Sequence, residues 1–170
     1  MCIRDRCDTP LDIQEAVFRE QLALARSLDK PVILHTKGQE KEIAGILKEY
    51  PNTYLVHWYS CGQFLEDYLA LDFYFSIGPD VWWNPAVRRV AEIVPLNRLL
   101  IETDGMNAVE WAYAEAPARR RLPPSSPAES LTDTLCEIAK IRHLPPEDAE
   151  LQIYHNLVHG FLKENLFSGM

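Results

Sequence analysis

Short apolar runs alternate with amphipathic segments along most of this chain. The runs lie at residues 30–36, 54–57, 73–77 and 98–104, and their apolar positions are largely continuous. Continuous apolar runs of roughly four to eight residues are typical of parallel strands that are covered on both faces. The runs begin about 20 to 25 residues apart, a spacing that favours compact βα units. We therefore predict an α/β fold with parallel strands.

The segments around these runs carry helix signals. Thr9 and Pro10 have the pattern of an N-cap followed by proline at the first helical position, which predicts a helix to about Leu28. The apolar stripe of this helix is expected at Ile13, Val17, Leu24 and Leu28. Further helices are expected at residues 40–50, 63–71, 84–94 and 127–142, and from 145–146 towards 166. The alternation of helix and strand signals stops over residues 105–127, and we expect a loop rich in proline and serine at 119–127.

Composition and charge restrict the class of protein. The chain has 170 residues and a net charge of -8, the wrong sign for a protein that coats nucleic acid non-specifically. The four cysteines are scattered without a Cys-x-x-Cys pair, which is typical of reduced thiols in a cytoplasmic protein. No apolar run approaches the roughly 18 residues of a membrane span, so a membrane is not an expected partner.

Polar residues stand at the ends of three predicted strands. His35, His57 and Asp104 fall where the carboxyl ends of parallel strands meet, the functional side of both doubly wound sheets and (β/α)8 barrels. Imidazole and carboxylate groups are suitable ligands for a divalent metal ion that activates water. The alternative for each residue is an ordinary hydrogen-bonded polar group near a strand end. No glycine-rich nucleotide loop follows any of the strands.

Four of these segments resemble successive motifs of the TatD family. The segments are KPVILHTK at 30–37, VHWYSCG at 56–62, DFYFSIG at 72–78 and LLIETD at 99–104, and Asn156 near the C-terminus also fits the family. The resemblance implies a metal-dependent hydrolase with an amidohydrolase-like (β/α)8 barrel, a family often described as deoxyribonucleases. It thus implies an α/β chain that forms part of a TIM barrel, with the later strands and helices only.

The resemblance also implies roles for individual residues. His35 and His57 match two histidines that bind one metal of a two-metal site. Asp104 matches a carboxylate that binds the other metal and orients or deprotonates the attacking water, so it is both a metal ligand and a catalytic residue. The metals would be divalent ions such as Zn, Mn or Mg, and the substrate DNA or a small phosphoester. Apart from the resemblance, strand alternation puts Glu102 on the same face as Asp104, where we expect it to hydrogen-bond within the site. Lys37 replaces an arginine that is more common in the family and is expected to contact a phosphate.

Two family motifs have no counterpart in this chain, namely the His-x-His of the first strand and a bridging Glu on another early strand. We therefore expect residues 7–170 to be the C-terminal portion of a TatD-like barrel and residues 1–6 to be a non-native leader. The incomplete metal site predicts an inactive chain in isolation, and uncovered strand edges predict self-association. The alternative is a non-catalytic half-barrel that acts as an interaction module.

Aromatic side chains follow several of the predicted strand ends. Trp58, Tyr59, Trp82 and Trp83 lie at positions where they could stack on a substrate base or pack in the core or at its rim. The sequence leaves both alternatives open.

Overall fold

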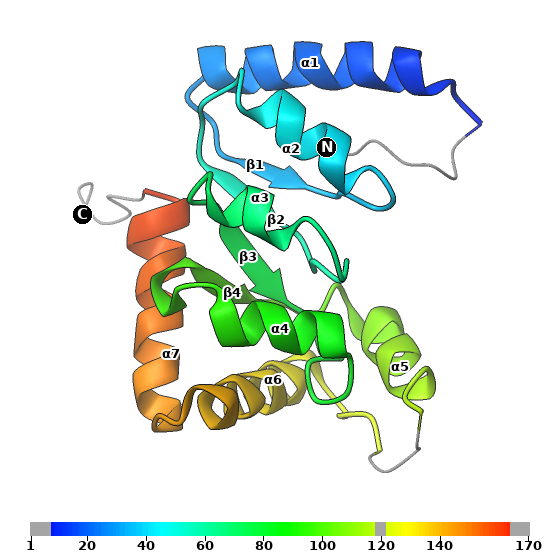
Figure 1. Cartoon of the computed structure of the whole chain (residues 1–170). Helices are drawn as coiled ribbons and strands as arrows, with labels where there is room; N and C mark the ends of the chain where they lie inside the picture. The colour runs from blue at the N-terminus through cyan, green and yellow to red at the C-terminus, as the bar shows by residue number, and fades with distance from the viewer. Residues whose placement is uncertain (1–7, 118–121, 164–170) are drawn as a thin grey trace.

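The computed structural model describes residues 8–117 and 122–163, so the segment 1–6 that we interpret as a leader lies outside the described residues. Four parallel strands form one sheet in the order β1-β2-β3-β4 (Figure 1). Their bounds are Val32–Leu34 for β1, Tyr54–Val56 for β2, Tyr74–Ile77 for β3 and Leu99–Ile101 for β4. Each strand falls within a predicted apolar run, which confirms the parallel α/β prediction.

The strand order decides between the two architectures that the sequence left open. Val32 is paired with Tyr54 and Phe75 with Leu99, so each strand pairs with the next one along the chain. A doubly wound sheet reverses its strand order at a switch point, whereas a barrel winds in one direction. The described strands show no reversal. The topology is therefore that of a barrel segment.

Helices connect the strands and extend beyond the last one. They are α1 Leu11–Ser27, α2 Glu40–Leu47, α3 Leu65–Leu69, α4 Pro85–Ile93, α5 Met106–Ala114, α6 Pro127–Arg142 and α7 Pro146–His155, with a 3-10 turn η1 Leu96–Arg98 and a π-helical turn η2 Asn156–Phe161. The caps of α4 and α6 are as predicted, since Asn84 accepts a hydrogen bond from the Ala86 amide and Ser126 from the Glu129 amide. Pro10 rather than Thr9 occupies the N-cap position of α1.

The predicted apolar stripe of α1 is wrong. Its four residues are between 47% and 58% exposed, and the helix instead buries Phe18, Leu22 and Ala25. Both faces of α1 carry apolar residues, and only the packing against its neighbours selects one of them. The prediction that every strand is covered on both faces also fails for β1, where Ile33 is 47% exposed.

Helix α5 was not predicted, because the alternation of helix and strand signals stops at Gly105 and no element was assigned to the residues before the loop at 119–127. It follows Gly105, which has a φ of +87° that suits glycine. Val109, Ala112 and Tyr113 form its buried face. Two of these residues, a small alanine and a β-branched valine, indicate a buried helix face only weakly. The helical period of hydrophobic residues is therefore weak in the sequence. The helix places its side chains beside the carboxyl ends of the strands.

Alternation along the strands divides the core into two parts. Residues such as Leu34, Val56 and Phe75 point to the helices and form the larger apolar cluster. On the opposite face, Leu55, Tyr74 and Leu100 pack with Phe161 of η2 in a smaller cluster. Strand alternation assigns His35, His57, Ser76 and Glu102 to this second face.

Within residues 8–117 and 122–163, none of the helices has the length and apolarity that a bilayer crossing requires.

Candidate active site

Backbone hydrogen bonds continue the sheet past the strand ends and position two candidate residues. The His57 amide donates to the Leu34 carbonyl at 2.9 Å, and the Glu102 amide donates to the Ile77 carbonyl at 3.1 Å. His57 is therefore held beside the end of β1, and Glu102 beside the end of β3. The rigid sheet, rather than a loop, fixes both side chains.

A pocket of about 790 Å³ opens at these strand ends. Its walls include four of the sequence-predicted residues, His35, Lys37, His57 and Asp104. The remaining residues that line it are Thr36, Gly38, Glu40, Trp58, Ser60, Ala108 and Trp111. Glu102 does not line the pocket and lies behind His57. The structure thus brings the predicted residues together from three strand ends.

His57 is the centre of this arrangement. Its Nδ1 lies 2.5 Å from Glu102 Oε2, and its Nε2 lies 3.6 Å from Asp104 Oδ2. The ring of His35 lies beside it, with the two ring centroids 4.4 Å apart. Asp104 itself has a φ of +54°, a conformation that aspartate tolerates better than most residues. One imidazole is therefore flanked by two carboxylates and a second imidazole.

Two hydrogen bonds fix the Glu102 carboxylate through the oxygen that does not contact His57. Ser76 Oγ donates a hydrogen bond to Glu102 Oε1, and the Trp58 amide donates to the same oxygen at 2.9 Å. Burial disfavours a charge on His57, but the hydrogen bond to Glu102 and the charges of Glu102 and Asp104 outweigh it, so the pKa of His57 is raised above its ordinary value. An imidazole whose Nδ1 is bound to a carboxylate presents a basic Nε2 on its other side.

These residues fit part of a metal site. In the described part of the chain, no group of three or more His, Cys, Asp or Glu side chains has an arrangement that could hold a metal ion. However, His57 Nε2, the His35 ring and the half-exposed Asp104 carboxylate all border one pocket. The Glu102–His57 contact is the carboxylate–histidine pairing that orients metal-binding histidines. The donor chemistry suits a divalent metal once further ligands are supplied.

The role of Glu102 can be tested by substitution. We expect Glu102→Gln to weaken Mn²⁺ binding by about 10- to 100-fold, because it removes the charge that orients and polarises His57. Isothermal titration calorimetry with MnCl₂ measures the change on the full product of the gene that encodes this chain. The exposed Glu150→Gln on α7 is the matched control and should leave the affinity unchanged. Equal affinities for the two variants would contradict the supporting role.

Trp58 closes one side of the pocket and is firmly anchored. Its Nε1 donates to Asp80 Oδ1 at 2.8 Å, and Asp80 also accepts from Asn84 Nδ2 at 2.7 Å. Burial raises the pKa of Asp80, although both hydrogen bonds oppose that shift. Neither Asp80 nor Ser76 was predicted from the sequence to be part of the site. Both are short polar residues at or just beyond the end of β3. This position at a strand end is the feature of the sequence that could have identified them.

Gly78 makes the close packing of Trp58 possible. A Cβ atom at this position would lie 2.1 Å from Trp58 Cε2, which no real contact allows. We expect Gly78→Ala to displace the indole and to lower the free energy of unfolding by about 1–3 kcal/mol through overpacking. Urea unfolding and the near-ultraviolet circular dichroism of tryptophan measure these effects. Gly45→Ala is the control, because a Cβ there meets nothing within 4 Å.

Other candidate residues have clear positions. Lys37 lies at the pocket rim, where its Nζ is 3.4 Å from Ser60 Oγ. Tyr59 is buried in the core, and Trp82 packs against Tyr113, with ring centroids 5.5 Å apart. Trp83 donates its Nε1 proton to the Ala112 carbonyl. Of the four aromatic residues considered from the sequence, Trp58 alone lines the strand-end pocket.

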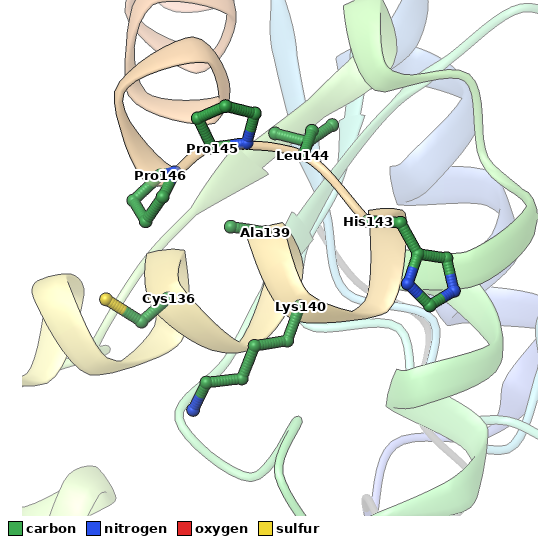
Figure 2. A pocket seen from close by; sticks show the side chains of 7 residues that line it. All are labelled: Cys136, Ala139, Lys140, His143, Leu144, Pro145 and Pro146. Carbon is green, nitrogen blue, oxygen red and sulfur yellow. The ribbon is translucent and has the colours of Figure 1, made fainter.

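A second hollow lies away from the strand ends. It has a volume of about 540 Å³ and is formed by the end of α6, the following turn and the start of α7, with Cys136, Lys140 and His143 among its residues (Figure 2). No carboxylate lines it. We therefore assign the candidate active site to the pocket at the strand ends.

Comparison with known families gives a match over most of the chain. Residues 4–161 match the family model described as "TatD related DNase". The "3'-5' ssDNA/RNA exonuclease TatD" of Rahnella is 33% identical over 126 residues, which cover 69% of this chain and 47% of that protein. An "Uncharacterized metal-dependent hydrolase" of Buchnera aphidicola is 28% identical over 168 residues, covering 93% of this chain and 59% of the relative.

A solved structure gives the same result for the fold. The TatD homologue YjjV of Escherichia coli aligns with a TM-score of 0.77 at 23% identity, covering 96% of this chain and 62% of YjjV. This likeness confirms the predicted partial TIM barrel. The chain therefore spans less than two thirds of the length of these relatives.

Proposed function

The chain belongs to the TatD family of metal-dependent hydrolases, and on this premise we propose that its strand-end pocket hydrolyses phosphodiester bonds in nucleic acid. The observation that carries the proposal is His57, which lies between Glu102 and Asp104 and beside His35. Two relatives support the choice of nucleic acid, because one is named a single-stranded DNA and RNA exonuclease and another, from Homo sapiens, a 3'-5' RNA nuclease.

Each residue has a distinct task in this proposal. His35, His57 and Asp104 would hold divalent metal, which polarises the phosphodiester and lowers the pKa of water when bound. Glu102 keeps the proton on His57 Nδ1, so that Nε2 is the atom directed to the pocket. Asp104 orients the attacking water and accepts its proton. Lys37 at the rim provides a positive charge for a substrate phosphate.

The direct test is a hydrolysis assay on the full product of the gene that encodes this chain. A fluorescently labelled single strand of DNA is incubated with Mn²⁺, Mg²⁺ or EDTA, and the products are separated by size. We expect cleavage that either metal stimulates and EDTA abolishes. The absence of metal-stimulated cleavage of DNA, RNA and bis(p-nitrophenyl) phosphate would overturn the proposal in favour of a non-catalytic half-barrel.

The 170-residue chain by itself is expected to behave differently. Because its described residues offer only part of a metal site, we expect weak Mn²⁺ binding and negligible turnover. Isothermal titration and the same cleavage assay measure both properties. Tight binding of two Mn²⁺ ions per chain would contradict this expectation and show that the described donors are sufficient.

A further inference from the structure

The strand-end pocket has two chemically different walls. His35, His57 and Asp104 form the polar wall, on which the proposed hydrolysis depends. Trp58 and Trp111 form the other wall and present aromatic surface. The proposed chemistry gives no task to this aromatic wall. An aromatic surface beside residues that are proposed to bind the substrate phosphate indicates a second contact with the substrate.

Trp58 is the fixed part of the wall. Its indole lies over Gly78, its Nε1 is bound to Asp80, and its amide is bound to Glu102. Its backbone has a φ of +40°, a conformation that few non-glycine residues adopt. These contacts leave little freedom for the ring. Trp58 therefore acts as a support against which a neighbouring ring can be positioned.

Trp111 is the accessible part of the wall. Its ring meets Trp58 edge to face, with centroids 6.2 Å apart and an angle of 71° between the planes. Trp111 follows Ala108 by three residues on α5, and both side chains line the pocket. Even so, 53% of Trp111 is exposed. An exposed indole that packs against a fixed partner offers apolar aromatic surface at low entropic cost.

The position of this surface relative to the polar wall suggests its ligand. The centroid of Trp58 lies 6.4 Å from that of His57 and 6.2 Å from that of Trp111, so the exposed indole is two ring contacts away from the proposed metal-binding imidazole. We propose that Trp111 stacks on a nucleobase of the nucleotide whose phosphate lies at His35, His57 and Asp104. This inference rests on the proposed function and makes Trp111 its base-binding residue.

Binding of product-like ligands tests this role separately from catalysis. Thymidine 5'-phosphate and 2-deoxyribose 5-phosphate carry the same phosphate and sugar, but only the first has a base. With the full gene product in Mn²⁺, isothermal titration should show about tenfold tighter binding of the nucleotide, since base–aromatic stacking supplies an advantage of this order. Trp111→Ala should remove the difference and leave the sugar phosphate unaffected, whereas Trp111→Phe should retain most of it.

Tyr154→Ala is the matched control, because Tyr154 is a comparably exposed aromatic residue on α7 outside the pocket. Equal weakening of both ligands by Trp111→Ala would overturn the proposal, as would an unchanged preference for the nucleotide or no nucleotide binding by the wild type. Base-dependent binding without hydrolysis would uphold the role of Trp111 and refute the proposed function. Hydrolysis without any preference for the ligand that carries a base would uphold the proposed function and refute the role of Trp111.

Discussion

Asp104→Asn is expected to lower kcat/KM for phosphodiester hydrolysis by more than about 100-fold, since altering a residue that only supports a ligand already costs about 10- to 100-fold. The amide keeps the size of the side chain and tolerates the left-handed backbone at this position, but it cannot accept a proton from water or neutralise a metal ion. Initial rates of the full gene product with a labelled DNA strand in Mn²⁺ measure the loss.

The chain offers a closely matched control for this substitution. Asp29 is exposed and has a φ of +48°, close to the +54° of Asp104, but it lies after α1 and outside the pocket. Asp29→Asn should therefore leave the rate unchanged. If Asp104→Asn retained the wild-type rate with an unaltered metal requirement, the catalytic role assigned to this carboxylate would be wrong.

Asn156→Ala is expected to lower the free energy of unfolding by about 2–4 kcal/mol, because it removes one buried and one partly buried hydrogen bond and leaves the accepting carbonyls without these donors. Asn156 is 2% exposed at the start of η2, and its Nδ2 donates to the Leu96 and Leu99 carbonyls at 2.7 and 2.8 Å. Urea unfolding followed by far-ultraviolet circular dichroism measures the change.

Asn97→Ala is the control for this stability measurement, because Asn97 is exposed and the hydrogen bond that it accepts from Arg98 Nη1 goes to its backbone carbonyl. Its expected effect is within about 0.5 kcal/mol, as is usual for surface substitutions. A loss for Asn156→Ala no greater than that for Asn97→Ala would mean that the C-terminal turn contributes little to holding β4.

The strands and the principal site residues could be predicted because both leave local signals. Continuous apolar runs locate the strands, and His35, His57 and Asp104 lie at the carboxyl ends of those runs, within three residues of the last strand residue. Parallel strands bring such positions to one edge of the sheet, whatever the details of packing. The approximate location of the pocket therefore follows from chain order alone. The assigned roles of these residues remain predictions.

The contacts that depend on register and packing could not be predicted in this way. Ser76 supports Glu102 only because β3 and β4 pair with Ser76 opposite Leu100, a register that no single segment encodes. The buried face of α1 is selected by its neighbours, since apolar residues occur on both of its faces. Trp111 was missed together with α5, whose helical period is weak in the sequence.

The sequential strand order also determines how the chain can assemble during synthesis. Each strand pairs with the strand before it, and neighbouring strands begin roughly 20 to 25 residues apart. Each pairing therefore closes only a short loop, which has a low entropic cost. The strands can therefore dock one after another as they leave the ribosome, from the N-terminal end onward. Asn156 emerges after all four strands, so its hydrogen bonds to the carbonyls of Leu96 in η1 and Leu99 at the start of β4 can form only then. Until then, β4, which Glu102 and Asp104 follow in the chain, lacks these two anchoring hydrogen bonds.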